Sequence, residues 1–113
     1  KYSGNIRVRR MVDTFLEHAR IWYFGNGGNP KLFLGSPDWM RRNLYRRIEA
    51  VTPILDPDAK QELIDMLSIQ LSDKRKACFV DENLHNCWKS AHPLKEKVRS
   101  QYTFYEYLKE RIE

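Results

Sequence analysis

The sequence predicts an α/β (α+β) domain, in which a mixed sheet of about four or more strands is covered by helices. Three observations predict it: short apolar runs that end in turn residues, longer stretches with apolar residues at helical spacing, and 42% hydrophobic with 31% charged residues. A chain of 113 residues with this balance can build one modest core. We therefore expect a single domain over residues 1–113. Because the chain begins with Lys1 rather than Met, we expect it to be a fragment of a longer chain.

The first predicted element is an amphipathic helix from Asn5 to Glu17. Its apolar residues recur at helical spacing, which places the arginines on the opposite face: Val8, Met11, Val12, Phe15 and Leu16. We expect this stripe to face the core.

A β-hairpin is predicted next. The run from Ala19 to Phe24 is rich in Ile, Trp, Tyr and Phe, and a second apolar run extends from Lys31 to Gly35. Between them stand six turn-forming residues, Gly25-Asn26-Gly27-Gly28-Asn29-Pro30. This arrangement is typical of two antiparallel strands joined by a short loop.

A third strand and a capped helix are predicted in the middle of the chain. In the segment from Arg46 to Pro53, Ile48, Ala50 and Thr52 alternate with Glu49 and Val51, and Pro53 ends the strand because it has no backbone N–H to donate. Asp56 then caps a helix that opens with Pro57 and Asp58, both favourable in a first turn. Its predicted buried stripe is Leu63, Ile64, Leu67 and Leu71.

The last third of the chain predicts one more strand and one more helix. The strand extends from Arg75 to Val80, and an irregular polar segment follows from Asp81 to Lys97. The closing helix extends from about Val98 to Ile112. One of its faces carries Val98, Tyr102, Tyr105, Leu108 and Ile112.

The charge balance points to an anionic partner. The net charge is +5, which attracts nucleotides, nucleic acid or polyphosphate without choosing among them. Cys78 and Cys87 have neither metal-ligand spacing nor a redox motif, so they indicate a reducing cytosol. The sequence shows neither an apolar run of membrane-spanning length nor a signal-peptide pattern, and we expect a cytoplasmic protein.

One group of residues suits phosphate chemistry. His18 and Arg20 are two positions apart, so in a strand their side chains share one face. A symmetric hairpin places Arg20 opposite Gly35, and His18 opposite the Ser36-Pro37-Asp38 corner. An imidazole, a guanidinium, a hydroxyl and a carboxylate around one point suit phosphoryl transfer, which depends on positioning and charge stabilisation.

Structural roles compete with these assignments. A lone histidine at a helix-to-strand junction, as predicted for His18, is more often a structural residue. Trp39 and Met40 would ordinarily be core residues, and paired arginines would ordinarily lie on a solvent-exposed face. His85 and His92 lie in a polar segment without metal-ligand spacing, so both are interpreted as structural or incidental. No metal ligand is predicted in the chain. The residues alone leave the role of His18 open.

The segment from Val12 to Ile54 also carries an ordered set of motifs. They are Phe15-Leu16-Glu17-His18-Ala19-Arg20-Ile21, Tyr23-Phe24-Gly25-Asn26-Gly27-Gly28-Asn29-Pro30, Gly35-Ser36-Pro37-Asp38-Trp39-Met40, Arg42-Asn43-Leu44, Arg46-Arg47-Ile48-Glu49 and Pro53-Ile54. This set closely resembles the last domain of the polyphosphate kinases, which make long-chain polyphosphate from ATP. Weaker resemblance continues through Asp56-Pro57, Gln70 to Ala77 and Val98 to Leu108, so it covers nearly the whole chain.

The resemblance implies a phospholipase-D-like architecture, in which two carboxy-terminal domains each contribute one histidine to a single site in a tunnel. The histidine phosphorylated by ATP belongs to the preceding domain, and the other resembles His18. Arg20 takes the place of the lysine in the His-x-Lys signature of phospholipase D enzymes, and Gly35-Ser36 through Asp38 takes the place of their small-residue and Asn corner. By this resemblance His18 is a catalytic proton donor or acceptor. The residues implied to bind ATP or phosphate are His18, Arg20, Ser36 and Asp38. The residues implied to line the path of polyphosphate are Arg41, Arg42, Arg46 and Arg47.

The same resemblance implies the partners. They are ATP or ADP, polyphosphate, Mg²⁺ held with ATP mostly outside this chain, and the preceding domains of the same enzyme. A homo-oligomer is expected for the full-length protein, and peripheral association with a membrane is left open. Three positions depart from the family pattern: Pro37 replaces Ala, Tyr45 replaces an acidic residue and Gly4 replaces Glu. No residue matches the block around the phosphorylated histidine or the amino-terminal residues that hold adenine, so the isolated fragment is expected to be inactive.

Two other functions are considered. A phospholipase-D-like phosphodiesterase or nuclease half-site predicts Lys two positions after the histidine, where this chain has Arg20. A basic polyanion-binding module without catalysis predicts salt-dependent binding that survives loss of His18. The sequence contains neither an RNA-binding motif nor a helix-turn-helix motif, so no specific nucleic acid is expected.

Overall fold

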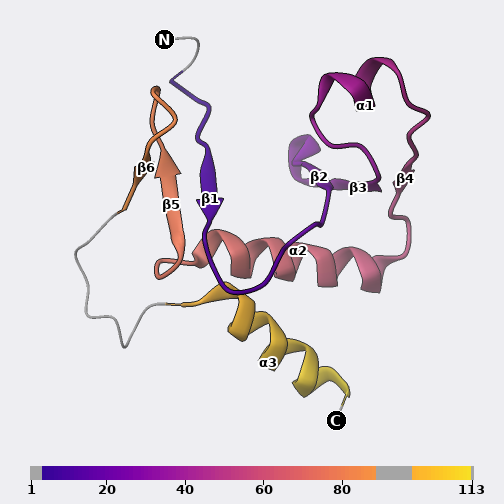
Figure 1. Cartoon of the computed structure of the whole chain (residues 1–113). Helices are drawn as coiled ribbons and strands as arrows, with labels where there is room; N and C mark the ends of the chain where they lie inside the picture. The colour runs from indigo at the N-terminus through magenta and orange to yellow at the C-terminus, as the bar shows by residue number, and fades with distance from the viewer. Residues whose placement is uncertain (1–3, 89–97, 113) are drawn as a thin grey trace. The chain divides into compact units, whose positions relative to one another are not determined.

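The computed structural model describes residues 4–88 and 98–112, and it contains helices and two separate antiparallel sheets (Figure 1). The chain forms two compact units, one from Lys1–Leu16 with Asp65–Glu113 and the other from Glu17–Ile64. The predicted α/β class is confirmed. The strands differ from the prediction in one respect, because they form two sheets of three strands each and not one mixed sheet.

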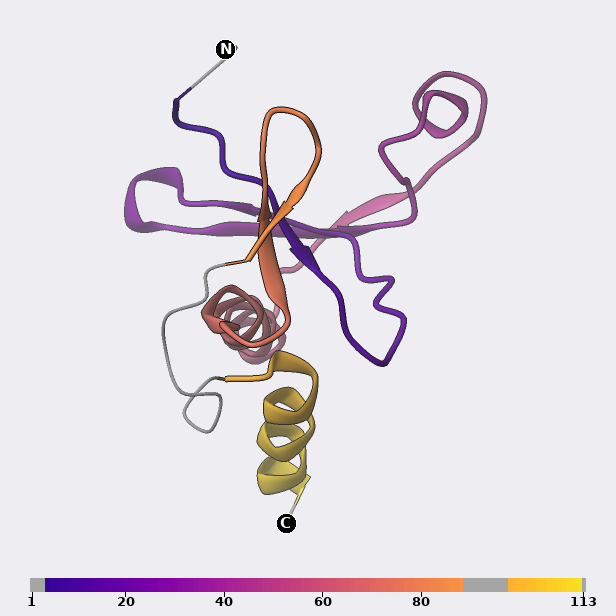
Figure 2. The ribbon, with the colours of Figure 1, turned by 60° about the vertical axis from the view of Figure 1, so that its left-hand side comes forward.

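The second unit is built on a β-hairpin. Its sheet has the order β2-β3-β4, with β2 at Ile21–Phe24, β3 at Lys31–Gly35 and β4 at Val51–Pro53 (Figure 2). The loop between β2 and β3 contains a short 3-10 turn, Asn26–Gly28. All three of its residues have positive φ, which Gly and Asn adopt most easily. The predicted hairpin and its turn are confirmed.

The hairpin register places the candidate site residues. Ile21 pairs with Leu34 and Trp22 with Phe33, and the amide of Gly35 donates to the carbonyl of Arg20 across 3.2 Å. Arg20 therefore lies opposite Gly35, as predicted. A side chain at Gly35 has no room, because an added Cβ would lie 2.7 Å from Cζ3 of Trp22.

The segment between β3 and β4 differs from the prediction. A short helix, α1 (Arg41–Tyr45), precedes β4, so only the last three residues of the strand predicted at Arg46 to Pro53 are in β4. The helix was missed because five residues are too few to show an apolar period and no side chain caps its start. Pro53 lies in an edge strand, where a missing amide is tolerated.

The helix α2 (Pro57–Ser72) begins as predicted. Oδ1 of Asp56 accepts a hydrogen bond from the amide of Ala59 at 2.8 Å, which satisfies a free donor of the first turn. Of the predicted buried stripe, Leu63, Ile64 and Leu67 are half-buried, whereas Leu71 is 63% exposed.

The first unit contains a sheet of order β1-β5-β6 and the helix α3 (Ser100–Ile112). The strands are β1 (Arg9–Met11), β5 (Ala77–Val80) and β6 (Asn86–Cys87), with Arg10 paired to Cys78. The helix predicted from Asn5 to Glu17 is therefore wrong. Pairing with β5, distant in sequence, overrides the local helical period, and the apolar stripe stays largely exposed, with Leu16 at 92%.

Two other predictions in this unit are confirmed. The strand predicted at Arg75 to Val80 is β5, although it starts two residues later, and the closing helix is α3. The predicted face of α3 is only partly covered, since Tyr105 is 64% and Ile112 87% exposed. The irregular segment contains the short strand β6, and its residues 89–97, including His92, lie outside the described part of the chain.

Asp73 connects three elements of the first unit. Its buried carboxylate accepts from the backbone amides of Arg75, Lys76 and Ala77 through Oδ1, and from the amide of Ser100 at 2.6 Å through Oδ2. Burial opposes ionisation, but these hydrogen bonds hold the pKa of Asp73 below its ordinary value. The ionised carboxylate of Asp73 therefore links the end of α2 to the starts of β5 and α3 by hydrogen bonds.

Candidate active site

The candidate site lies where the hairpin of the second unit ends. Residues 18–20 lead into β2, and residues 36–38 form the corner after β3. Because β2 and β3 are paired up to Arg20 and Gly35, the two short segments are adjacent. The structure thus brings together His18, Arg20 and Asp38, as the sequence predicts.

Arg20 and Asp38 form an ion pair at this position. Nε of Arg20 donates to Oδ1 of Asp38 at 2.7 Å, and the two side chains are 21% and 38% exposed. This hydrogen bond holds the pKa of Asp38 below its ordinary value, against partial burial, and the charges of Arg20 and Arg42 act in the same direction. The same bond raises the pKa of Arg20. Both groups are therefore charged at neutral pH.

His18 remains accessible beside this pair. Nη2 of Arg20 lies 2.5 Å from Nε2 of His18, and 68% of the imidazole side chain is exposed. A guanidinium has no lone pair, so it must donate this hydrogen bond and Nε2 must accept it. The ring proton of His18 is then on Nδ1, and Nε2 is the basic atom that faces Arg20.

A cavity adjoins the ion pair. It has a volume of about 310 Å³ and is lined by residues 19–22 and 37–39. Arg20 and Asp38 are among the residues that line it, together with Trp39, which is 84% exposed. The expectation that Trp39 and Met40 are core residues is wrong, because both are exposed; Met40 is 47% exposed.

Ser36 lies at the corner but its hydroxyl is engaged elsewhere. It donates to Oε2 of Glu49 and accepts from the amide of Ala50 at 3.1 Å, while the amide of Ser36 donates to the carbonyl of Ala50 at 2.9 Å. These contacts tie the corner to the segment before β4. Ser36 therefore holds the corner in place, in a conformation where its hydroxyl is not directed at His18.

Glu49 is a site residue that the sequence analysis did not identify. Its side chain is 13% exposed, lies 3.6 Å from Nε of Arg47, and contributes to the raised pKa of Arg20. The one available signal was its position in the Arg46-Arg47-Ile48-Glu49 block. Alternation along a predicted strand could not show that its carboxylate returns to the corner.

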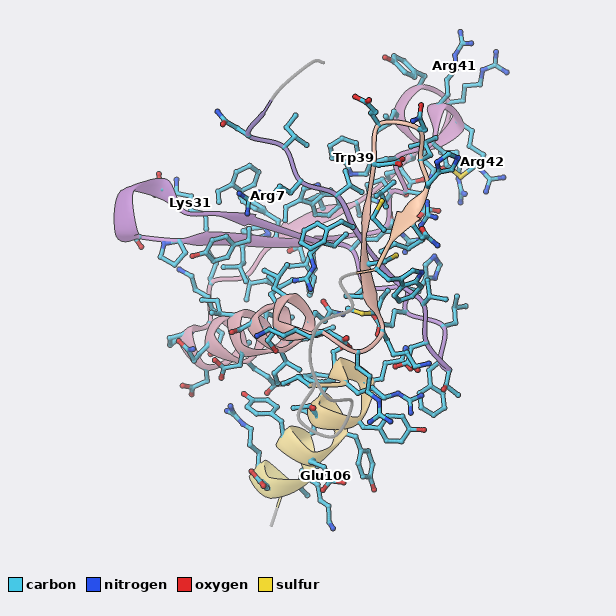
Figure 3. All side chains as sticks on the ribbon, turned by 90° about the vertical axis from the view of Figure 1, so that its left-hand side faces the viewer. Arg7, Lys31, Trp39, Arg41, Arg42 and Glu106 are labelled. Atoms are coloured by element: carbon cyan, nitrogen blue, oxygen red, sulfur yellow. The ribbon has the colours of Figure 1, made fainter. Side chains whose placement is uncertain are left out.

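The four predicted polyphosphate-lining arginines are exposed residues on and after α1. Arg41 and Arg42 extend outward from α1, whereas Lys31 lies near the other end of the hairpin (Figure 3). Arg46 ends the helix and Arg47 contacts Glu49. Exposed guanidinium groups on this segment can attract an anionic chain.

Within residues 4–88 and 98–112, no group of three or more His, Cys, Asp or Glu is arranged to hold a metal ion. In the same ranges, helix length and apolar content fall short of what crossing a bilayer requires. His85 is bound to Asp81, with 3.5 Å between Nδ1 and Oδ2, and Cys78 and Cys87 are free thiols.

Fold and site together define a mixed α/β domain that presents an accessible imidazole and a fixed guanidinium, a combination suited to phosphoanions. The chain belongs to the polyphosphate kinase family, since residues 1–101 match the family model described as "Polyphosphate kinase C-terminal domain 2". The predicted family is thereby confirmed.

Individual relatives agree with this assignment. The chain is 45% identical to a polyphosphate kinase from Escherichia coli strain K12 and 44% identical to one from Vibrio cholerae, over 95% of this chain and 15% of each relative. A crystal structure of polyphosphate kinase from Porphyromonas gingivalis is 53% identical, with a TM-score of 0.87 over 96% of this chain and 16% of that one. The chain therefore spans about 15% of the length of these relatives.

Proposed function

We propose that this chain supplies one half of an active site that transfers the γ-phosphoryl group of ATP reversibly to long-chain polyphosphate. The observation that supports this most is the convergence of His18, Arg20 and Asp38 beside a cavity, in a chain that belongs to the polyphosphate kinase family. The phosphohistidine intermediate forms on a histidine outside this chain. The isolated chain is accordingly inactive.

In this proposal Arg20 and His18 act on the transferred phosphoryl group. Arg20 neutralises charge on the phosphate oxygens, which favours the in-line transfer of a group that carries several negative charges. His18 exchanges a proton with the reacting oxygen through Nε2, the atom that now accepts from Arg20. An incoming phosphate oxygen competes for the same guanidinium and frees Nε2 for that exchange.

Mg²⁺ accompanies ATP in this proposal, but the described residues do not provide its ligands. Asp38 is bound to Arg20, and Glu49 is bound to Ser36 and lies near Arg47. The phosphates of ATP and residues elsewhere in the protein are then the ligands of the ion. No step assigned to this chain depends on the metal.

Polyphosphate is guided by the exposed arginines of the α1 segment. Arg41, Arg42, Arg46 and Arg47 all lie within a short stretch that follows the Asp38 corner. A polymer with charge along its whole length requires such a series of cations near the site. The phosphodiesterase alternative is less favoured, because Arg20 replaces the expected Lys and the relatives are named polyphosphate kinase.

For the full-length protein we propose a cytoplasmic, homo-oligomeric enzyme that can associate peripherally with a membrane. The free exposed thiol of Cys87 and the free buried thiol of Cys78 support a reducing compartment.

The proposal is tested by His18→Ala in the full-length protein that carries this chain. We expect ATP-dependent polyphosphate synthesis to fall at least about a hundredfold, the usual scale for a positioned proton-transfer group. His85→Ala is the matched control, since His85 is also exposed but lies outside the site. Full synthesis by the His18 variant would remove this residue from the mechanism.

A further inference from the structure

We propose that Asp38 is a positioning residue, which orients Arg20 toward the transferred phosphoryl group and does not itself bind phosphate. This inference rests on the proposed function and assigns a separate task to one member of the site. It differs from the role that the phosphate-binding corner of related enzymes suggests for this position.

The guanidinium of Arg20 contacts two acceptors. Nε of Arg20 donates to Oδ1 of Asp38 at 2.7 Å, and Nη2 donates to Nε2 of His18 at 2.5 Å. Oδ1 of Asp38 lies 3.9 Å from the same imidazole nitrogen. These two acceptors define the plane and the direction of the Arg20 head group, and Asp38 supplies the one that phosphate binding leaves in place.

The free donors of Arg20 indicate where an anion binds. In the part of the chain that the structure describes, the hydrogen bonds of the Arg20 side chain involve Nε and one contact of Nη2. Nη1 takes no part in these bonds, and the contact of Nη2 with His18 is the one that an incoming phosphate oxygen displaces, so the edge formed by Nη1 and Nη2 can bind two phosphate oxygens in a bidentate contact. Asp38 thus leaves the phosphate-binding edge open by occupying Nε.

Electrostatics argue against direct contact between Asp38 and phosphate. The carboxylate carries a negative charge, and its hydrogen bond with Arg20 holds its pKa below the ordinary value. A phosphate oxygen beside it would meet like charge in a partly buried place, which is unfavourable. Asp38 borders the cavity, but its hydrogen bond is with Nε of Arg20.

The corner also holds Asp38 in position. Pro37 is buried and its ring fixes one backbone angle of the corner. Directly before it, Ser36 is tied to Glu49 and Ala50 by both its hydroxyl and its amide. The carboxylate is therefore presented by a restrained backbone, as a positioning group requires.

A double-mutant cycle in the full-length protein tests the inference. We compare Asp38→Asn, Arg20→Gln and their combination by kcat/KM of polyphosphate synthesis, with Asp58→Asn as a control on the exposed first turn of α2. Asp38→Asn keeps an acceptor but removes its charge, and we expect a loss of about tenfold, the scale of one charge-assisted hydrogen bond. If Asp38 acts through Arg20, the double variant is no worse than Arg20→Gln. If the losses of kcat/KM in the two single variants multiply in the double variant, Asp38 has a role independent of Arg20 and the inference is overturned.

Chemical rescue separates positioning from a structural role. In an Arg20→Ala variant, added guanidinium ion can occupy the vacated position, and we expect it to restore part of the synthesis when Asp38 is present. In the Arg20→Ala/Asp38→Asn variant we expect restoration at least about tenfold weaker, because the charged acceptor that holds the ion is lost. Equal rescue in both backgrounds contradicts the inference. Loss of synthesis in His18→Ala supports the proposed function separately, so the two ideas can fail independently.

Discussion

The amide of Gly35 donates a hydrogen bond to the carbonyl of Arg20 across 3.2 Å, and this contact fixes which residues face each other at the end of the hairpin. A shift of one residue would send Arg20 to the other face of the sheet, away from Asp38. The candidate site therefore depends on a backbone register before it depends on any side chain.

The space around Gly35 leads to a prediction on stability. Gly35→Ala places a Cβ 2.7 Å from Cζ3 of Trp22 and 2.9 Å from Cγ2 of Val51, so the sheet must shift. We expect a loss of about 1–3 kcal/mol in the free energy of unfolding, measured by urea denaturation, as for other overpacked sites. Gly25→Ala is the control, since an added Cβ there has open space. Equal stability of the two variants contradicts this account of the hairpin.

The cap of α2 gives a second prediction. Asp56→Ala removes the acceptor of the Ala59 amide, and we expect the chain to lose about 1 kcal/mol of stability. Asp58→Ala removes only a first-turn charge, so its cost should be a few tenths of a kcal/mol, or about 0.3–1 at low salt. The stability losses of the two variants are compared by thermal denaturation at the same ionic strength. A larger effect at Asp58 than at Asp56 would be inconsistent with the cap.

The ion pair of Asp13 and Arg99 predicts a pH dependence. Arg99 donates to both carboxylate oxygens, at 2.9 and 3.1 Å from Nε, and these hydrogen bonds lower the pKa of Asp13 from 3.8 to about 2. A carboxyl whose folded pKa is depressed stabilises the fold above its unfolded pKa, and the contribution is lost as pH falls through the folded pKa. Unfolding free energy should therefore decrease between pH 3.8 and about 2.

Asp13→Asn is the comparison for that titration. The variant is less stable at neutral pH, and its unfolding free energy changes less over the same acidic range, because the titrating carboxyl is absent. Urea denaturation at several pH values measures both curves. Parallel curves for the two proteins would mean that Asp13 does not contribute through its ionisation.

The arginines of α1 predict an effect on the polymer substrate. In the full-length enzyme, Arg41→Ala/Arg42→Ala should raise the KM for polyphosphate by about fivefold, because each exposed charge contact contributes about 0.2–1 kcal/mol. The KM for ATP should change less, and added salt should narrow the difference between variant and wild type. Lys109→Ala on α3 is an exposed cationic control. An unchanged KM for polyphosphate would exclude these two residues from its path.

Local signals account for what the sequence predicted correctly. The hairpin could be predicted because the turn residues and both strands are contiguous, and the register then follows from the position of the turn. The α2 cap is equally local, since Asp56 acts on an amide three residues away. The juxtaposition of Arg20 and Asp38 follows directly from that register.

The errors arise where distant residues decide the structure. Arg9–Met11 forms a strand because β5 lies beside it, and no pattern within residues 5–17 shows that partner. The phosphate-binding role of Ser36 stays a prediction, but the contact of its hydroxyl with Glu49, 13 positions away in sequence, could not be predicted from the local pattern. A side chain that reaches a site from a distant segment of the chain produces no periodic pattern in the sequence around that site.

The most direct measurement is a crystal structure of the full-length protein with a non-hydrolysable ATP analogue. We expect a terminal phosphate oxygen within about 2.7–3.2 Å of both Nε2 of His18 and the outer edge of Arg20, with Asp38 still bound to Nε of Arg20. A phosphate bound elsewhere, with the imidazole of His18 directed away from it, would exclude His18 and Arg20 from phosphoryl transfer.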